Sequence, residues 1–255
     1  MIQPPALSGI APPCDTFASM ALREIFDDPA AAIADIPDGS VIMQGGFSAA
    51  LGAPVQLMKA FIETSQARDL TFIGNGTPQV SLGGRGGEML TIDPARVRKV
   101  IVSFPTSQSR TRGFGSVFTE AIEEGKVDLE LVPQGTLAER LRAGGAGIPA
   151  FFTPTGAGTR FADGKEQREF EGRQYVMERW LRADYAFVHA IKADRLGNLV
   201  YRNTARNFNP LMASAARITI AEVDELVEPG EISPYEVVTP GIFVHRIVVL
   251  NRKES

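Results

Sequence analysis

The segment SVIMQGGFSAALGAPVQLMKAFI, residues 40–62, holds a strand, a glycine-rich turn and a helix in immediate succession. Its apolar start has the length of a strand, and Gly45, Gly46 and Gly52 follow it. Pro54 suits the first turn of a helix, and the apolar side chains after it recur at helical spacing, namely Leu57, Met58, Phe61 and Ile62. The segment therefore predicts a buried strand that turns directly into an amphipathic helix.

The same alternation continues along the chain. Further apolar runs predict strands at 70–73, 99–102, 127–132, 184–191, 217–223 and 242–250. Helical patterns lie between the earlier runs, at about 114–124 and from Thr136 onward, where Thr136 and Glu139 match a capping box. Strands separated by single helices join by parallel crossovers. We therefore expect an α/β fold, with one open, mostly parallel sheet and flanking helices.

Two segments differ from this pattern. Residues 1–27 begin with a proline-rich stretch that lacks a basic and apolar leader pattern, so we interpret them as a loose N-terminal extension. Residues 151–182 combine short β-like pieces with four glycines, which predicts a β-rich, hairpin-containing cap. We expect residues 28–255 to form a single domain that includes this excursion.

The composition limits the possible functions. The 255 residues carry a net charge of −4 with both signs interspersed, which argues against binding of nucleic acid or an anionic membrane. No apolar run approaches the roughly 18 residues of a membrane-spanning helix. The single cysteine, Cys14, excludes an internal disulfide and favours a reducing compartment. We expect a soluble, cytoplasmic protein.

The first candidate binding element is the turn from Gly45 to Pro54. Small residues let a ligand approach the backbone, and free N–H groups at the start of a helix favour an anionic or strongly polar ligand. The spacing matches neither a dinucleotide-binding fingerprint nor a phosphate-binding P-loop. A tight turn that binds nothing is the open alternative.

Three further candidates follow in the chain. Gln134 lies between a strand and a helix, where its amide could donate to a carbonyl or carboxylate, or could face solvent as a turn residue. Gly144, Gly145 and Gly147 predict a loop near a substrate or a partner chain, because glycines destabilise a helix interior. The polar residues around Phe208, which are Arg206, Asn207 and Asn209, favour the structural role of pinning a loop.

No catalytic group stands out in the chain. His189 and His245 each fall in a predicted buried strand, and no metal-site spacing accompanies them. No nucleophile elbow of the hydrolase type is present, and Cys14 belongs to the predicted extension. Binding loops without an attacking group predict an active site that a second polypeptide completes.

These motifs resemble the A (alpha) subunit of family I 3-oxoacid CoA-transferases, the group that includes succinyl-CoA:3-oxoacid, acetate/acetoacetate and 3-oxoadipate CoA-transferases. The similarity extends from about Asp28 to about Val249 and rests on four stretches: DGSVIMQGGF (38–47), VPQGTLAERLRAGGAGIPAFFTPTGAGT (132–159), KADRLGNLVYRNTARNFNPLMA (192–213) and VTPGIFVHRIV (238–248).

The resemblance implies a CoA-transferase fold and a reaction that moves CoA from an acyl-CoA, with succinyl-CoA as the expected donor, to a 3-oxo acid such as 3-oxoadipate or acetoacetate. It implies a glutamyl-CoA thioester on a partner B subunit, in a heterodimer or an α2β2 assembly, with CoA thioesters as substrates and no permanently bound cofactor or metal. The family's active-site glutamine falls on Gln134. The CoA- and acyl-binding positions fall on Gly45, Gly46, Phe47, Ser48, Gly52, Asn75 and Gly76.

The chain departs from the family pattern near the implied acyl pocket. Gln44 replaces an aliphatic residue, the loop from Phe47 to Gly52 is one residue longer, and Gly76 replaces the second of two asparagines. The stretch 76–95 is also longer, and Arg85, Arg110 or Arg112 could pair with a second carboxylate or remain solvated. Two alternatives stay open: a divergent acyl-CoA hydrolase or ring-opening enzyme, and a non-catalytic subunit that binds CoA esters.

Overall fold

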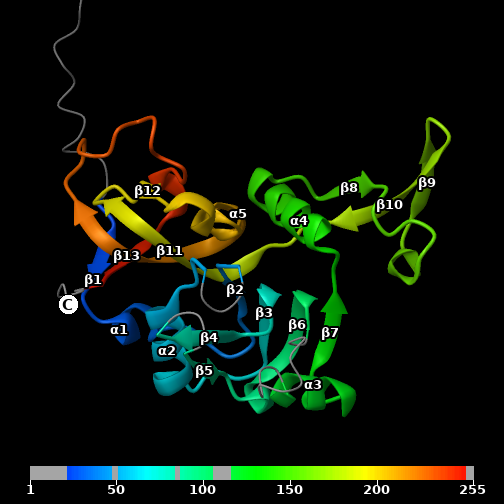
Figure 1. Ribbon diagram of the computed structural model, residues 1–255, viewed down its shortest axis with the longest axis horizontal. Helices are drawn as coiled ribbons and strands as arrows, with labels where there is room; N and C mark the ends of the chain where they lie inside the picture. Colours follow the sequence, from blue (N-terminus) through cyan, green and yellow to red (C-terminus); the bar gives the residue numbers. More distant parts are fainter. Residues whose placement is uncertain (1–21, 48–50, 84–86, 106–115, 251–255) are drawn as a thin grey trace, which may run out of the picture.

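The computed structural model of the protein describes residues 22–47, 51–83, 87–105 and 116–250 (Figure 1). One sheet organises this part of the chain, in the order β1-β14-β13-β11-β2-β3-β6-β7, with β12 paired to β11. The strands are β1 Glu24–Phe26, β2 Val41–Gln44, β3 Leu70–Gly76, β6 Val97–Phe104, β7 Asp128–Leu131, β11 Ala183–Asp194, β12 Leu199–Val200, β13 Ala216–Val227 and β14 Arg246–Val249. All pairs are parallel except β11 with β12. The expected open, mostly parallel α/β sheet is confirmed.

Helices cover both faces of the sheet. The helices are α1 Pro29–Ile33, α2 Val55–Thr64, α3 Ser116–Glu123, α4 Gln134–Ala146 and α5 Asn209–Ala215. Alternate strand residues separate two cores, since Ile42 and Phe72 pack with α1 and α2, whereas Met43 and Ile73 pack with α4 and α5. Both cores make the central strands apolar throughout, which is why they are visible in the sequence as continuous runs.

The connections change direction between β11 and β2. From β2, the chain crosses through α2 to β3 on one side, whereas from β11 it crosses through α5 to β13 on the other side. Helices α2 and α5 belong to different cores and therefore to opposite faces. In open α/β sheets such a switch point creates a crevice at the carboxyl ends of the strands, where ligands bind.

Two smaller sheets accompany the main one. Strands β8 Ala150–Thr153, β9 Gln167–Phe170 and β10 Arg173–Arg179 form an antiparallel sheet within the segment expected to be β-rich, and Figure 1 shows it extending from the body of the molecule beside α4. Strands β4 Gln79–Leu82 and β5 Glu88–Thr91 form a hairpin. The assignment of residues 1–27 to a loose extension stays a prediction, because most of them lie outside the described ranges.

Two short-range predictions at the edges of elements were wrong. The run 242–250 is a strand only at Arg246–Val249, because Gly241–Phe243 forms a 3-10 helix. The helix expected from Thr136 begins at Gln134 with Pro133 in the N-cap position, and Thr136 is buried instead of capping. Glu139 binds Arg142 at 2.8 Å and caps nothing.

The glycine cluster after this helix was also misassigned. Gly144 and Gly145 lie inside α4, and only Gly147, with a φ of +72°, ends it as a left-handed C-cap. A Cβ on Gly144 would lie 1.9 Å from the carbonyl oxygen of Leu181, and one on Gly145 would lie 2.3 Å from Ser214 Oγ. Close packing of α4 on its neighbours therefore explains these glycines, not exposure to a ligand.

We expect Gly144→Ala to lower the free energy of unfolding by about 1–3 kcal/mol, because the new methyl group overlaps the Leu181 carbonyl group. Gly135→Ala, in the same helix, is the matched control, since a Cβ there meets nothing within 4 Å. Alanine should leave stability equal or slightly higher at that position. Urea unfolding of both variants checks this, and equal midpoints would contradict the packing explanation.

Arg140 has a structural role that its place on an expected exposed helix face did not indicate. It is 8% exposed and bonds Glu130 at 2.7 Å, and Glu178 lies 3.8 Å from it. Its Nε atom also donates to the carbonyl oxygen of Arg179 at 2.7 Å. Arg140 therefore ties α4 to both β7 and β10.

Candidate functional site

The candidate site lies at the carboxyl ends of four adjacent strands. Gln44, Gly74, Val102 and Leu131 are paired in one row across β2, β3, β6 and β7. The segments directly after this row contain the sequence-predicted residues, because the chain leaves each parallel strand at the same edge. Residues that are far apart in the sequence therefore meet at this edge of the sheet.

The glycine turn after β2 is shaped by very close contacts. The N–H of Gly45 donates to the carbonyl oxygen of Phe187 at 2.9 Å, and a Cβ on Gly45 would lie 2.0 Å from Asn209 Oδ1. Gly46 has a φ of +102°, and its Cβ would lie 2.8 Å from the Cα atom of Ala53. The N–H of Phe47 donates to the carbonyl oxygen of Leu51 at 2.9 Å. Ser48 lies outside the described residues.

Two asparagines hold this turn from the other side of the switch point. Asn209 is fully buried, and its Nδ2 atom donates to the carbonyl oxygens of Gly52 at 2.9 Å and Ala205 at 3.0 Å. Asn207 Nδ2 donates to the carbonyl oxygen of Leu51 at 3.0 Å. These contacts confirm the structural role expected for the asparagines, whereas Arg206 is exposed.

We expect Asn209→Asp to destabilise the protein by about 2–3 kcal/mol, because a second acceptor oxygen would replace the amide that donates to two carbonyl groups. Asn203→Asp serves as the control, since Asn203 is exposed in a neighbouring turn and its replacement should change stability by less than about 0.5 kcal/mol. Thermal unfolding at constant pH measures both. Similar values for the two variants would show that Asn209 does not hold the turn.

Glu222 anchors the helix that follows the turn. It is 1% exposed in β13, and its Oε2 atom accepts hydrogen bonds from the backbone N–H groups of Gln56 at 2.8 Å and Leu57 at 2.9 Å. Burial raises the pKa of Glu222 to about 8, although the N–H donors act against the rise. Sequence reasoning missed this residue, but a carboxylate within the apolar run ITIAEV is a signal that could have identified it.

Gln134 and Asn75 form a direct pair at this edge. Gln134 begins α4, Asn75 lies near the end of β3, and Gln134 Nε2 donates to Asn75 Oδ1 at 2.6 Å. An amide nitrogen carries two hydrogens, so Gln134 can offer a second N–H to a ligand while it stays bound to Asn75. Gly76 continues β3 beside Phe104 of β6.

Unsatisfied polar atoms gather at the same edge. Among the described residues, four side chains have a buried polar atom with no hydrogen-bond partner, and three of them follow or end the central strands: Gln44, Ser103 and Thr136. Buried polar groups are normally paired in proteins. Their concentration here indicates that a polar ligand or ordered water belongs at this edge.

A cleft of about 40 Å³ lies between the glycine turn and the β4–β5 hairpin. Its lining is uncharged and consists of Gln44, Gly45, Gly46, Asn75, Gly76, Thr77 and Gln79. Gln44 Nε2 donates to the carbonyl oxygen of Gln79 at 2.8 Å. Arg85, Arg110 and Arg112, considered above as partners of a second carboxylate, lie outside the described ranges.

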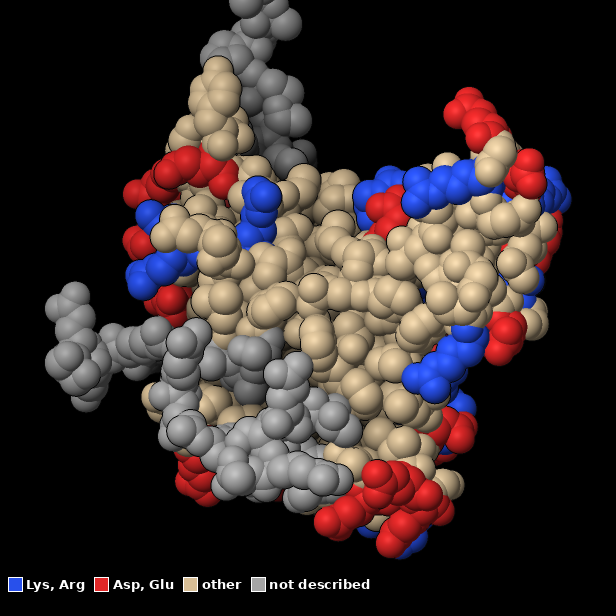
Figure 2. Space-filling model, turned by 45° about the vertical axis from the view of Figure 1, so that its right-hand side comes forward, with Lys and Arg blue, Asp and Glu red and all other residues tan. Residues whose placement is uncertain are grey.

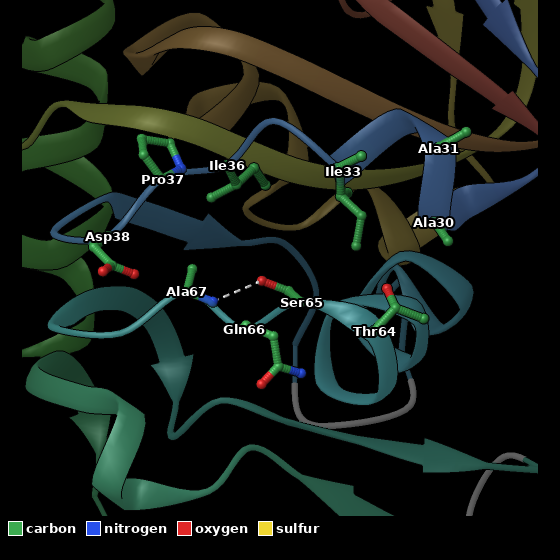
Figure 3. Close-up of a pocket in the computed structure, with 11 residues that line it drawn as sticks. Ala30, Ala31, Ile33, Ile36, Pro37, Asp38, Thr64, Ser65, Gln66 and Ala67 are labelled. Atoms are coloured by element: carbon green, nitrogen blue, oxygen red, sulfur yellow. Dashed lines mark hydrogen bonds between the residues drawn. The ribbon is translucent and has the colours of Figure 1, made fainter.

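A larger hollow of about 750 Å³ lies elsewhere, between α1 and the end of α2 (Figure 3). Its lining includes Asp38 and Gln66, and the rest is formed mainly by small residues that precede β2 and β3. It therefore opens at the amino ends of the strands, away from every sequence-predicted site residue. We favour the smaller cleft because the unpaired polar atoms and the Gln134–Asn75 pair are at the carboxyl edge.

Neither histidine belongs to a metal centre in the described part of the chain, where no group of three potential ligands occurs. His189 Nε2 lies 3.3 Å from Asp224 Oδ1, and His245 Nδ1 accepts the N–H of Thr219 at 3.1 Å. Burial lowers the pKa of His245. None of the described helices is long and apolar enough to cross a membrane.

Comparisons with known proteins agree with this geometry. The sequence pattern of the family described as Coenzyme A transferase matches residues 26–250. The alpha chain of the 3-oxoadipate CoA-transferase of Pseudomonas putida is 48% identical, over 90% of this chain and 95% of its own length. The alpha chain of a probable succinyl-CoA:3-ketoacid coenzyme A transferase of Mycobacterium bovis is 47% identical, over 86% of this chain and 90% of its own length.

Solved structures support the same fold. An acyl-CoA transferase of Escherichia coli O157:H7, crystallised as a thioester complex with CoA, superposes with a TM-score of 0.73 and 19% identity. The match covers 92% of this chain but 48% of that one, so the present chain spans about half the length of that protein.

Proposed function

Because this chain belongs to the coenzyme A transferase family, we propose that it is the alpha subunit of an enzyme that moves CoA from an acyl-CoA to a 3-oxo acid. The observation that carries this proposal is the Gln134–Asn75 pair, which lies at the carboxyl edge of the sheet together with the glycine turn. The names of the relatives point to succinyl-CoA as the donor, and to 3-oxoadipate or acetoacetate as the acceptor.

The chain's own residues would bind and polarise the substrate. In the proposed reaction, a glutamate carboxylate on the partner chain attacks the thioester carbonyl carbon, and negative charge develops on the carbonyl oxygen. The second N–H of Gln134 would stabilise that charge, since Asn75 already fixes the orientation of the amide. The backbone at Gly45, Gly46 and Gly52, with the exposed ring of Phe47, would contact CoA or the acyl group, as would Ser48 and Gly76.

The remaining steps conserve all groups. The CoA thiolate released by the attack takes the glutamyl carbonyl carbon, which frees the donor acid and leaves a glutamyl-CoA thioester. The acceptor carboxylate then repeats the sequence in reverse and leaves as an acyl-CoA. The substrate brings CoA itself, so the proposal needs no permanently bound cofactor or metal.

A partner B subunit would supply the glutamate, in a heterodimer or an α2β2 assembly. Three large apolar side chains are exposed near the carboxyl edge, namely Phe47 at 40%, Leu51 at 44% and Phe104 at 48%. Figure 2 shows a broad uncharged area across the middle of one face, with charged side chains along its margins. Such a surface suits a stable protein interface. We place the enzyme in the cytoplasm, where its acyl-CoA substrates would be available.

The direct test combines this chain with its B partner and measures transfer of labelled CoA from succinyl-CoA to acetoacetate and to 3-oxoadipate. We expect exchange that depends on both chains, and a glutamyl thioester that hydroxylamine or borohydride traps on the partner. Hydrolysis of succinyl-CoA without a trapped thioester would instead support the acyl-CoA hydrolase alternative. Stabilisation by CoA esters without any turnover would support a non-catalytic subunit.

A further inference from the structure

One acceptor atom in the cleft lacks a partner. Gln44 is 9% exposed, and its Oε1 atom is buried without a hydrogen bond. The orientation of the amide is settled by its other end, because Nε2 donates to the carbonyl oxygen of Gln79 at 2.8 Å. Rotating the amide by half a turn would place two carbonyl oxygens against each other. The unpaired atom is therefore an acceptor, and it requires a donor.

The surroundings of Gln44 restrict what that donor can be. All the residues that line the cleft are uncharged, so an ammonium group would enter without a counter-ion and a carboxylate would find no cation. The volume of about 40 Å³ accommodates a group of a few atoms. A hydroxyl group fits both limits, since it is neutral, small and able to donate.

The cleft also adjoins the proposed reaction centre. Asn75 lines the cleft and accepts the hydrogen bond of Gln134. Gln44 is paired with Gly74, the residue directly before Asn75 on the neighbouring strand. Neighbouring strands are separated by about 4.8 Å. An acyl group held by its carboxyl end at Asn75 and Gln134 could therefore extend its next carbon atoms toward Gln44.

We propose that Gln44 is a specificity-determining residue, which selects acyl groups that carry a hydroxyl group close to the carboxyl end by accepting a hydrogen bond on Oε1. This role rests on the proposed function, since it assumes that the acyl group of a CoA-transferase substrate lies at Asn75 and Gln134. A polar site of this kind discriminates against the ligand that lacks the matching group, because the acceptor is then left buried and unpaired.

The experiment compares butyrate with 2-, 3- and 4-hydroxybutyrate as CoA acceptors for the complex of this chain with its B partner. In the natural protein, kcat/KM for at least one hydroxy acid should exceed that for butyrate about tenfold, which corresponds to one net hydrogen bond. In Gln44→Met, which has a side chain of similar size without the amide, the same ratio should fall close to one. Taking ratios within each variant removes any general change in activity.

Gln66→Met is the matched control, because Gln66 is an exposed amide that lines the hollow at the opposite edge of the sheet (Figure 3). That variant should keep the preference of the natural protein. Equal kcat/KM values for butyrate and all three hydroxy acids in the natural protein would overturn the role of Gln44, whatever the variants do. A preference that persists in Gln44→Met would overturn it as well.

Thermal stabilisation of the complex by each acid is measured in parallel, because binding needs no turnover. Absence of transfer to every acid, with a hydroxyl preference in binding that Gln44→Met removes, would contradict the proposed function and support the role of Gln44. Absence of both overturns both proposals. If Gln44→Met instead weakens binding of CoA itself, the donor belongs to the CoA arm and the proposed acyl specificity is wrong.

Discussion

Replacement of Gln134 by alanine is expected to lower kcat of CoA transfer by the assembled enzyme about 10²-fold, with a smaller change in KM. The reason is that the Gln134 amide would donate to an oxygen whose negative charge is larger in the transition state than in the bound substrate. The hydrogen bond of 2.6 Å to Asn75 holds the amide in position before substrate arrives. Steady-state kinetics with succinyl-CoA and a 3-oxo acid measure the change.

Asn75→Ala separates positioning from direct contact. It leaves the Gln134 amide in place but removes its partner, so we expect a loss of kcat smaller than that of Gln134→Ala. Gln66→Ala is the control, since this exposed amide is remote from the carboxyl edge and its loss should leave kcat unchanged. Full turnover in Gln134→Ala would show that Gln134 is only the first residue of a helix.

Replacement of Glu222 by alanine is expected to lower the free energy of unfolding by about 3–5 kcal/mol, which is the largest effect on stability that we predict. The change leaves the N–H groups of Gln56 and Leu57 without an acceptor in a buried position and opens a cavity behind the glycine turn. Glu222→Gln keeps an acceptor oxygen of the same reach and should cost much less at neutral pH. Chemical unfolding of the two variants provides the comparison.

The pH dependence of stability should distinguish the carboxyl group from the amide. The carboxyl group of Glu222 keeps its proton up to about pH 8 when folded, because burial raises its pKa from the ordinary value of 4.5. Folding therefore takes up a proton between these values. The stabilising contribution is complete below about pH 4.5 and is lost as pH rises through 8.

The measurable quantity is the difference in unfolding free energy between the natural protein and Glu222→Gln. It should shift against the natural protein by up to roughly 1.4 kcal/mol per pH unit within this window, since all other titrating groups are shared. A difference that stays constant from pH 5 to pH 8 would mean that Glu222 is ionised in the folded chain throughout.

The central strands could be predicted because each is buried on both faces. Met43 and Ile73 face one core while Ile42 and Phe72 face the other, so the apolar run itself identifies the strand. Gln134 could be placed at a strand end for the same reason. Its distance to Asn75 could not, because the two residues are 59 positions apart and meet only through the pairing of β3, β6 and β7.

The glycine cluster at the end of α4 shows where local reasoning was misleading. Helix propensity disfavours Gly144 and Gly145, and by that measure a loop was the better prediction. The helix forms because a larger side chain at these positions would collide with Leu181 and Ser214, so the gain from close packing outweighs the local cost. Information of this kind lies in the neighbouring elements and not in the cluster itself.

The sequence by itself determined the α/β class, the apolar strands, the glycine turn after β2 and the absence of a convincing nucleophile, because these depend on residue type and on spacing within one element. Only the tertiary structure decided which loops share the carboxyl edge, that Glu222 caps α2, and that Gln44 is left with an unpaired oxygen. Those facts depend on strand order and on burial, and both arise from contacts between residues that are distant in the chain.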